Sequence, residues 1–286
     1  MDIGIAINRF RAAPGMTRPL ILVTNDDGIY SGGLRAAAEV ARSLGDVLIV
    51  APGTQQTGMG RSFPRSENQG VIEVRQGALG GGTIPYYAVS GSPAQAVAHG
   101  VLEIASQRPA LCISGINDGE NLGGTNLISG TVGAALEATG FGIPALAVSL
   151  GPEDPDLFAK PYREADWRVA AGVIRQFAAT VLDDGLPPQV ALLNINVPSS
   201  AVPETPIRIT RQSRQSHYGC TSPGLRDLSK PFRLPVAELI DFATLEPDSD
   251  LYAFFVDRVI SVTPMAGDLT VRDAGGAPLN IFAGAR

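Results

Sequence analysis

Short apolar runs of strand length alternate with segments of helical periodicity along most of this chain. Residues 19–24 (PLILVT) form the first run, and residues 47–51 (VLIVA) form the next. Between them, residues 31–44 carry apolar side chains at helical spacing, with Ser31 as the expected N-cap. A strand, a helix and a second strand in this order predict two parallel strands joined by a crossover helix.

The same alternation continues beyond this first unit. Further strands are expected at residues 71–76, 83–89, 110–114, 144–150, 190–198, 207–211 and 259–264, and further helices at 92–106, 131–140 and 164–183. The strands are largely apolar, as in parallel sheets that are covered on both faces. The pattern therefore predicts an α/β fold with a mostly parallel sheet and helices on both of its faces.

Two segments depart from this rhythm. Residues 1–17 have no clear periodicity and are expected to form a flexible tail, which leaves residues 18–286 as a single domain. Residues 212–250 are rich in Ser, Pro, Arg and Asp and interrupt the alternation, so they are interpreted as an insertion or arm.

Composition excludes several classes of protein. The 286 residues carry a net charge of −6 without a Lys/Arg run, so no nucleic-acid polymer is expected as a partner. Two cysteines and two histidines argue against a disulfide scaffold and a Cys-rich zinc site. There is no apolar stretch of membrane-spanning length, and the apolar start precedes Arg9 and Arg11, the reverse of a secretory signal. We therefore expect a cytoplasmic protein without a membrane partner.

Polar clusters follow three of the predicted strands. They are Asn25-Asp26-Asp27-Gly28, residues 53–58 (GTQQTG) and residues 114–119 (SGINDG). Open α/β sheets bind ligands outside the carboxyl ends of their strands, so all three clusters are candidates for one site. The chain lacks GxGxxG after its first strand and a GxxxxGK[ST] loop, so dinucleotide binding and a P-loop ATPase lose support.

The residue types in these clusters suit a hard cation. Adjacent carboxylates at Asp26 and Asp27 repel each other unless a cation lies beside them. The hydroxyl of Thr57 and the amide oxygen of Asn117 complete an all-oxygen set that suits Mg²⁺, Mn²⁺ or Ca²⁺. The alternatives are a turn in which Asp27 only caps the next helix and an ordinary Gly-Asn turn at Asn117.

Ser129-Gly130-Thr131 opens a predicted helix. The free N–H groups of a helix start, with hydroxyls beside them, can bind an anion such as phosphate. The alternative is that Ser129 serves only as an N-cap.

Four stretches in this order resemble the SurE family of metal-dependent 5′/3′-nucleotidases. They are LVTNDDGI (22–29), LIVAP (48–52), ISGINDGENLG (113–123) and SGTVGAALE (129–137). LNINVP (193–198) and VISVTP (259–264) match further family stretches, so the resemblance covers most of the chain.

The resemblance implies a Rossmann-like three-layer sandwich and a divalent-metal-dependent phosphomonoesterase that hydrolyses nucleoside monophosphates. One Mg²⁺ or Mn²⁺ per subunit, with Ca²⁺ as an alternative, would be held by Asp26, Asp27, Thr57 and Asn117. Asp27, Asp26 and Asn117 are the expected catalytic residues, and the expected phosphate-binding residues are Ser129, Gly130, Thr131 and Asn25. A homodimer or homotetramer is implied, with residues 212–250 as a swapped C-terminal β-rich arm.

The sequence departs from the family pattern around the expected substrate. The family has an acid and two arginines where this chain has Gly53, Thr54 and Gln56, and it has a tyrosine where this chain has Ile128. The expected metal ligands are kept while the surrounding rim loses positive charge. An alternative function is therefore a metal- and phosphate-binding module with little turnover, or with an altered substrate, either polyphosphate or another phosphate ester.

Overall fold

The computed structural model describes residues 18–151, 165–273 and 276–278. The predicted tail at residues 1–17 and the first residue of the helix expected at 164–183 lie outside the described residues.

A nine-stranded sheet forms the centre of the fold, in the order β3-β4-β2-β1-β5-β6-β7-β11-β8. Strands β4, β2, β1, β5, β6 and β7 are mutually parallel, whereas β3 and β11 run antiparallel to β4 and β7. The strands are β1 (Leu20–Thr24), β2 (Asp46–Pro52), β3 (Ile72–Leu79), β4 (Gly82–Val89), β5 (Leu111–Asp118), β6 (Ala145–Leu150), β7 (Leu192–Val197), β8 (Ile207–Ile209) and β11 (Ile260–Met265).

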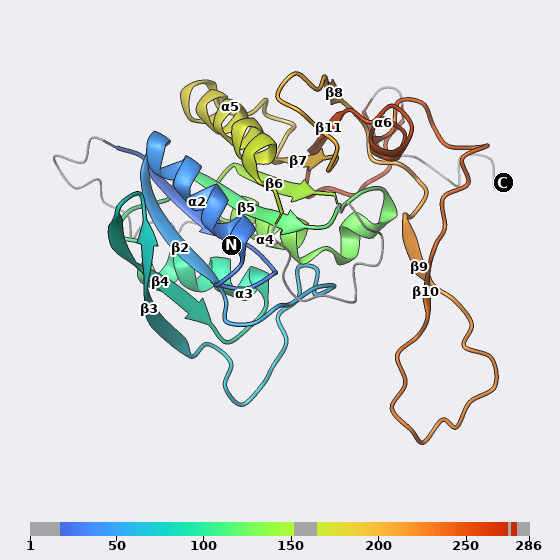
Figure 1. The fold of residues 1–286 in the computed structure, drawn as a ribbon, viewed down its shortest axis with the longest axis horizontal. Coiled ribbons are helices and arrows are strands. Elements are labelled where there is room, and N and C mark those ends of the chain that lie inside the picture. The colour runs from blue at the N-terminus through green and yellow to red at the C-terminus, as the bar shows by residue number, and fades with distance from the viewer. Residues whose placement is uncertain (1–17, 152–164, 274–275, 279–286) are drawn as a thin grey trace.

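Helices cover both faces of this sheet (Figure 1). The main helices are α2 (Gly32–Leu44), α3 (Pro93–His99), α4 (Gly130–Gly140) and α5 (Arg168–Asp184). Helices α2 and α5 bury one apolar cluster against the sheet, and α3 and α4 bury a second cluster on the opposite face. The predicted three-layer α/β arrangement is confirmed. None of the described helices is long and apolar enough to cross a membrane.

The helix starts follow the capping residues expected from the sequence. The Ser31 hydroxyl accepts a hydrogen bond from the Leu34 N–H at 3.2 Å at the start of α2. Ser92 caps α3 in the same way and forms a reciprocal capping box with Gln95. The helix expected at 92–106 changes character, however, because α3 ends at His99 and a π-helical turn, η1 (Gly100–Ile104), follows it.

Strand β5 extends further than the predicted strand at 110–114. Its pairing with β6 shifts register after Ser114 and then resumes, with Asn117 opposite Ser149. Gly and Asn are poor strand formers, so the sequence pattern concealed this extension. As a result, Asn117 lies on the end of the strand itself and not in a loop.

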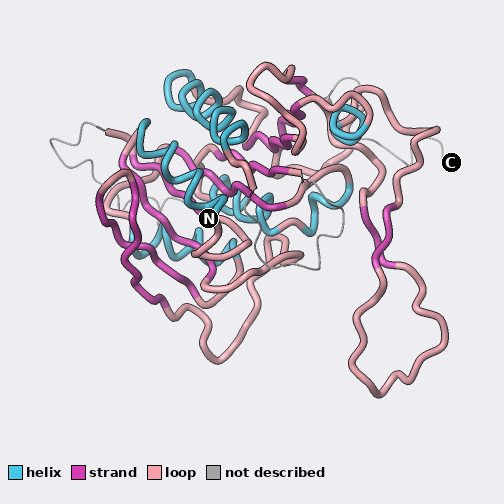
Figure 2. The backbone as a smooth tube through the Cα atoms, viewed as in Figure 1, coloured by secondary structure: helices cyan, strands magenta, loops and turns pink. Residues whose placement is uncertain are grey.

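The segment expected to form an arm, residues 212–250, divides into two parts. The projecting part is residues 218–238, and the arm base is the residues on either side of it, which pack on the body. Strands β9 (Tyr218–Cys220) and β10 (Val236–Glu238) pair antiparallel, and the chain between them extends away from the body (Figures 1 and 2). Residues after β10 return to the body, where Leu245 packs with Leu122 and with helix α6 (Asp250–Phe255). The projecting part therefore spans fewer residues than the arm predicted at residues 212–250.

The carboxylate of Asp250 fastens the arm base to the loop after β5. It is fully buried and accepts backbone hydrogen bonds from Gly123 at 2.9 Å and from Ser213 and Leu251 at 2.8 Å each. One side chain therefore ties together the loop, the start of the arm and the start of α6.

Replacing Asp250 with alanine is expected to lower the free energy of unfolding by about 3 kcal/mol, because three buried N–H groups lose their acceptor. Asp250→Asn keeps one acceptor oxygen and should cost less. Urea denaturation of both variants measures this order. Equal stability of wild type and Asp250→Ala would contradict the anchoring role.

Candidate active site

The predicted site residues gather where the chain order of the sheet reverses. From β1 the chain continues to β2 on one side, and it returns on the other side of β1 to form β5. Asp26 and Asp27 follow β1, and Asn117 is the residue before the last one of β5. This is the crevice at which open α/β sheets bind their ligands.

Asp26 lies against the first turn of helix α4. Its side chain is 3% exposed, and the Thr131 hydroxyl donates a hydrogen bond to Oδ1 at 2.5 Å. A Cβ atom at Gly130 would lie only 2.6 Å from the Asp26 Cβ, so glycine permits this close approach. The Gln56 N–H also donates to the Asp26 carbonyl at 2.7 Å. The N-terminus of α4 and the loop after β2 both hold Asp26.

Asp27 lies beside the end of β5. It is 8% exposed, and the Asp118 N–H donates to its Oδ2 at 3.1 Å. Burial raises the pKa of Asp26, and burial together with the charge of Asp26 raises the pKa of Asp27. The side chain of Gln55, which the sequence analysis did not single out, opposes this rise in pKa through a hydrogen bond to Asp27.

Asn117 presents an oxygen at the same edge. Its Nδ2 donates to the Gly119 carbonyl at 2.7 Å, which fixes the amide and leaves Oδ1 as the group available to a ligand. Thr57 is exposed in the loop after β2, one residue beyond the N–H that bonds Asp26.

These residues fit a hard divalent cation. Two adjacent buried carboxylates carry a like-charge penalty that a cation relieves, and amide and hydroxyl oxygens are suitable additional ligands. Among the described residues no three His, Cys, Asp or Glu side chains converge. Oxygens of Asn117 and Thr57, or of water, would therefore have to complete the coordination.

The hydroxyls at the start of α4 are engaged within the protein. Ser129 accepts from the Val132 N–H at 3.1 Å, as an N-cap does, and Thr131 donates to Asp26. Any anion bound here would therefore meet main-chain N–H groups of the first turn, including that of Gly130.

Asn25 is fully buried and shapes the turn that carries the two aspartates. Its Nδ2 donates to the Gly28 carbonyl at 3.1 Å, and its Oδ1 accepts from the Gly28 N–H at 3.2 Å. These contacts support a positioning role, while the phosphate contact expected from the sequence stays a prediction.

A buried hydrogen-bond network that the sequence analysis missed joins the loop after β5 to strands β6 and β7. The side-chain Nδ2 of Asn121 donates to the Ser149 hydroxyl at 2.9 Å. The main-chain N–H of Asn121 donates to Asn196 Oδ1 at 2.7 Å. Asn194 and Asn196 both donate to the Asn121 carbonyl at 2.9 Å. The available signal was the pair of asparagines at alternate positions in the otherwise apolar strand at 190–198.

His217 also has a partner that the sequence did not reveal. Its Nδ1 lies 2.7 Å from Glu120 Oε1, and both side chains are buried. The imidazole ring packs on Tyr218 and Phe255, with centroid distances of 3.7 and 4.4 Å. This pair joins the arm base to the loop after β5.

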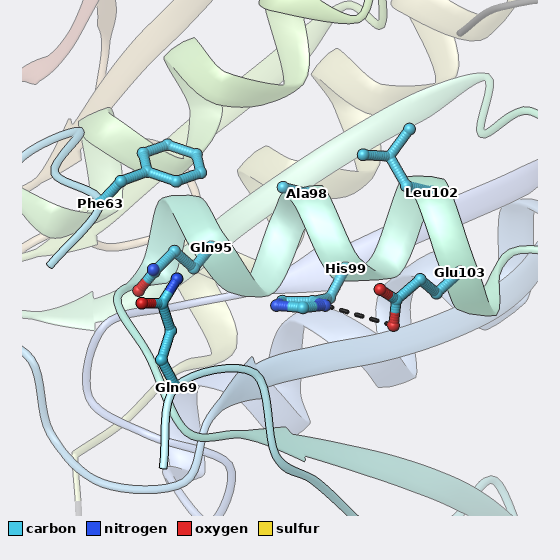
Figure 3. A pocket seen from close by; sticks show the side chains of 7 residues that line it. All are labelled: Phe63, Gln69, Gln95, Ala98, His99, Leu102 and Glu103. Carbon is cyan, nitrogen blue, oxygen red and sulfur yellow. Dashed lines mark ion pairs between the residues drawn. The ribbon is translucent and has the colours of Figure 1, made fainter. Parts of the chain in front are cut away.

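A small hollow of about 110 Å³ on the outer side of α3 contains the other histidine (Figure 3). His99 faces Glu103 of the following helical turn at 3.3 Å, and Phe63 lies across the hollow. Gln95, at one end, is committed to the capping box. The side chains here serve local structure.

The mostly parallel sheet, covered by helices on both faces, defines the class as an α/β protein, and its candidate site is the buried aspartate pair beside the start of α4. The family model described as Survival protein SurE matches residues 21–219, and the chain belongs to this family. The predicted family is confirmed.

Curated relatives and a solved structure agree. A 5′-nucleotidase SurE of Methanocella arvoryzae is 39% identical over 254 residues, covering 87% of this chain and 92% of the relative. One of Thermococcus gammatolerans is 38% identical over 253 residues, covering 88% and 91%. The crystal structure of a SurE protein from Aquifex aeolicus superposes with a TM-score of 0.69 at 30% identity, covering 88% and 95% of the two chains. The predicted fold class is confirmed.

Without a bound cation, we expect the protein to gain stability as the pH falls from about 8 to about 5. The pKa of Asp26 and of Asp27 is raised by folding, so the folded state binds more protons than the unfolded state between the unfolded and folded pKa values. The loss of folding stability caused by ionising the two buried aspartates is absent below their pKa in the unfolded state, and it grows as the pH rises through this window.

Thermal melting in chelator at several pH values measures this effect, with the double variant Asp26→Asn/Asp27→Asn as control. The control should show a flatter pH dependence than wild type. Parallel pH profiles for the two proteins would show that the aspartate pair is not the cause.

Proposed function

We propose that this protein is a divalent-metal-dependent phosphomonoesterase that hydrolyses nucleoside monophosphates to nucleosides and phosphate. The observation that carries the proposal is the buried Asp26–Asp27 pair against the first turn of α4, which brings a cation site and an anion site together. The names of the relatives, 5′-nucleotidase SurE, support the nucleotide substrate.

Asp26, Asp27, Asn117 and Thr57 are the proposed ligands of one Mg²⁺ or Mn²⁺. When bound, such an ion polarises a phosphoryl oxygen and makes a coordinated water more acidic. Main-chain N–H groups of Gly130 and its neighbours would orient the phosphoryl group and stabilise its developing charge.

The two aspartates have different proposed roles. Asp26, held by Thr131, acts mainly as a ligand. Asp27 lies beside the end of β5, where it would accept the proton of the attacking water. Asn117, with its amide fixed by Gly119, would contact both the cation and the phosphoryl group.

We also propose that the protein assembles as a dimer or tetramer by exchange of the projecting arm. The arm exposes several large apolar side chains that a partner subunit would cover. They are Leu225, Leu228, Phe232, Leu234 and Val236. Light scattering of the full chain should give a dimer or tetramer mass, and a monomer at micromolar concentration would contradict this assembly.

A substrate panel tests the function directly. Phosphate release is measured from nucleoside 5′- and 3′-monophosphates, β-glycerophosphate and polyphosphate, each with Mn²⁺ or Mg²⁺. Preferential release from nucleoside monophosphates is expected. Tight binding of phosphate without release from any substrate would instead support the binding-module alternative, and release from polyphosphate alone would support another substrate class.

A further inference from the structure

A cavity with a volume of about 350 Å³ lies beside the aspartate pair. Its walls include Ile29 and Tyr30 before α2, Thr54 and Gln56 after β2, and Ser90 after β4. All of these follow the carboxyl ends of parallel strands, so the cavity opens on the same edge of the sheet as Asp26. A volume of this size is within the range of small-molecule pockets, about 300–1,000 Å³.

The wall of the cavity is physically continuous with the aspartate site. The Gln56 N–H donates to the Asp26 carbonyl at 2.7 Å, and the Gly53 N–H donates to Val89 at 3.0 Å. The Ile29 N–H, also in the cavity wall, donates to the Pro52 carbonyl at 2.9 Å. A phosphate ester held at Asp26 therefore has this cavity beside it.

The charges around the cavity balance. Glu73 and Arg75, side by side on β3, form an ion pair with each other. Residues 53–56 (Gly-Thr-Gln-Gln) carry no charge. Among the described residues that line the cavity, an additional phosphate would find no cation without an anionic partner, whereas a neutral leaving group with hydroxyls would find the polar groups of Thr54, Gln56 and Ser90.

Tyr30 supplies an aromatic surface on the same cavity. Its side chain is 68% exposed although it directly follows the fully buried Ile29, so its ring is available to a ligand. Nucleobases stack on such exposed aromatic rings, and this contact does not require a particular pattern of hydrogen-bond donors and acceptors.

We propose that this cavity binds the nucleoside part of the substrate, with the base stacked on Tyr30 and the ribose facing Thr54 and Ser90. The inference rests on the proposed function and deepens it by assigning Tyr30 as a substrate-binding residue that sets preference. It also favours monophosphates of nucleosides over substrates that carry a second phosphate.

The test compares Tyr30→Ala and Tyr30→Phe on two substrates, adenosine 5′-monophosphate and β-glycerophosphate, which has no ring to stack. Tyr30→Ala should lower kcat/KM for the nucleotide about 10-fold, mainly through KM, since stacking contributes to binding. The same variant should leave β-glycerophosphate hydrolysis unchanged, and Tyr30→Phe should keep near-wild-type values. Equal losses on both substrates, or no loss on either, would overturn the assignment.

Two further variants sharpen the result. Phe63→Ala removes a comparably exposed aromatic ring from the hollow on α3 and should change neither substrate. Val71→Trp places a large side chain at an exposed position lining the cavity and should raise KM for the nucleotide alone. A nucleotide KM that is unaffected by Val71→Trp, in protein with native melting behaviour, would contradict occupancy of the cavity.

Failure of the proposed function has a different signature. If wild type releases phosphate from neither substrate, the enzyme proposal fails, and equilibrium dialysis with adenosine then tests the cavity on its own. Binding to wild type that is weakened in Tyr30→Ala supports the inference. Equal binding to both proteins, or binding to neither, overturns it.

Discussion

Replacing Asp27 with asparagine is expected to lower kcat for nucleoside monophosphates by about 10³-fold while the fold persists. The substitution keeps the shape of the side chain and removes the charge of one proposed ligand, together with the proposed proton acceptor. Phosphate release with saturating Mn²⁺ measures the loss. Asp46→Asn, which alters an exposed aspartate at the start of β2, is the matched control and should retain full activity.

The same substitution should make the cation-free protein more stable. Burial and the neighbouring charge of Asp26 raise the pKa of Asp27, so a neutral side chain relieves a cost in the folded state. We expect the Tm in chelator at pH about 8 to rise by about 2–4 °C, the shift that about 1 kcal/mol produces in a protein of this size. Loss of activity with loss of stability would instead indicate that Asp27 has a structural role.

Replacing Gly130 with alanine is the second change with a large expected effect. The added methyl group would meet Asp26 at 2.6 Å from Cβ and 2.8 Å from Oδ2, so Asp26 or the start of α4 must move. We expect a loss of about 1–3 kcal/mol in the free energy of unfolding and a fall in kcat/KM of about 100-fold. Denaturation and phosphate release on one preparation measure both.

Gly172→Ala is the matched control for this variant. Gly172 lies within helix α5, is exposed, and has no atom within 4 Å of an added Cβ. Alanine there should stabilise the protein by about 0.5–1 kcal/mol and leave activity unchanged. A Gly130→Ala variant that behaves like this control would show that α4 does not constrain Asp26.

The central part of the fold is predictable because each strand and helix has a local signal. Apolar runs define β1 and β2, and Ser31 marks the start of the helix between them. The end of β5 is not visible in the sequence, because Gly115 and Asn117 read as a turn when considered alone. Pairing with β6 keeps these residues in the sheet, which is a tertiary effect.

The site is predictable only in part, for a related reason. Asp26, Asp27 and Asn117 stand out because polar residues follow apolar strands. Asn121 and Asn196 come from distant segments, and only folding brings them within hydrogen-bonding distance. The cavity at Tyr30 likewise depends on the placement of β4 beside β2, which no local pattern specifies.

The most direct measurement is the cation dependence of phosphate release from adenosine 5′-monophosphate by wild type and Asp26→Ala. Wild type treated with chelator should release no phosphate, and added Mn²⁺ or Mg²⁺ should restore release in a saturable way. Asp26→Ala should stay inactive at every cation concentration. Full activity of chelated wild type, or cation-restored activity of Asp26→Ala, would contradict a metal-dependent phosphomonoesterase built on the aspartate pair.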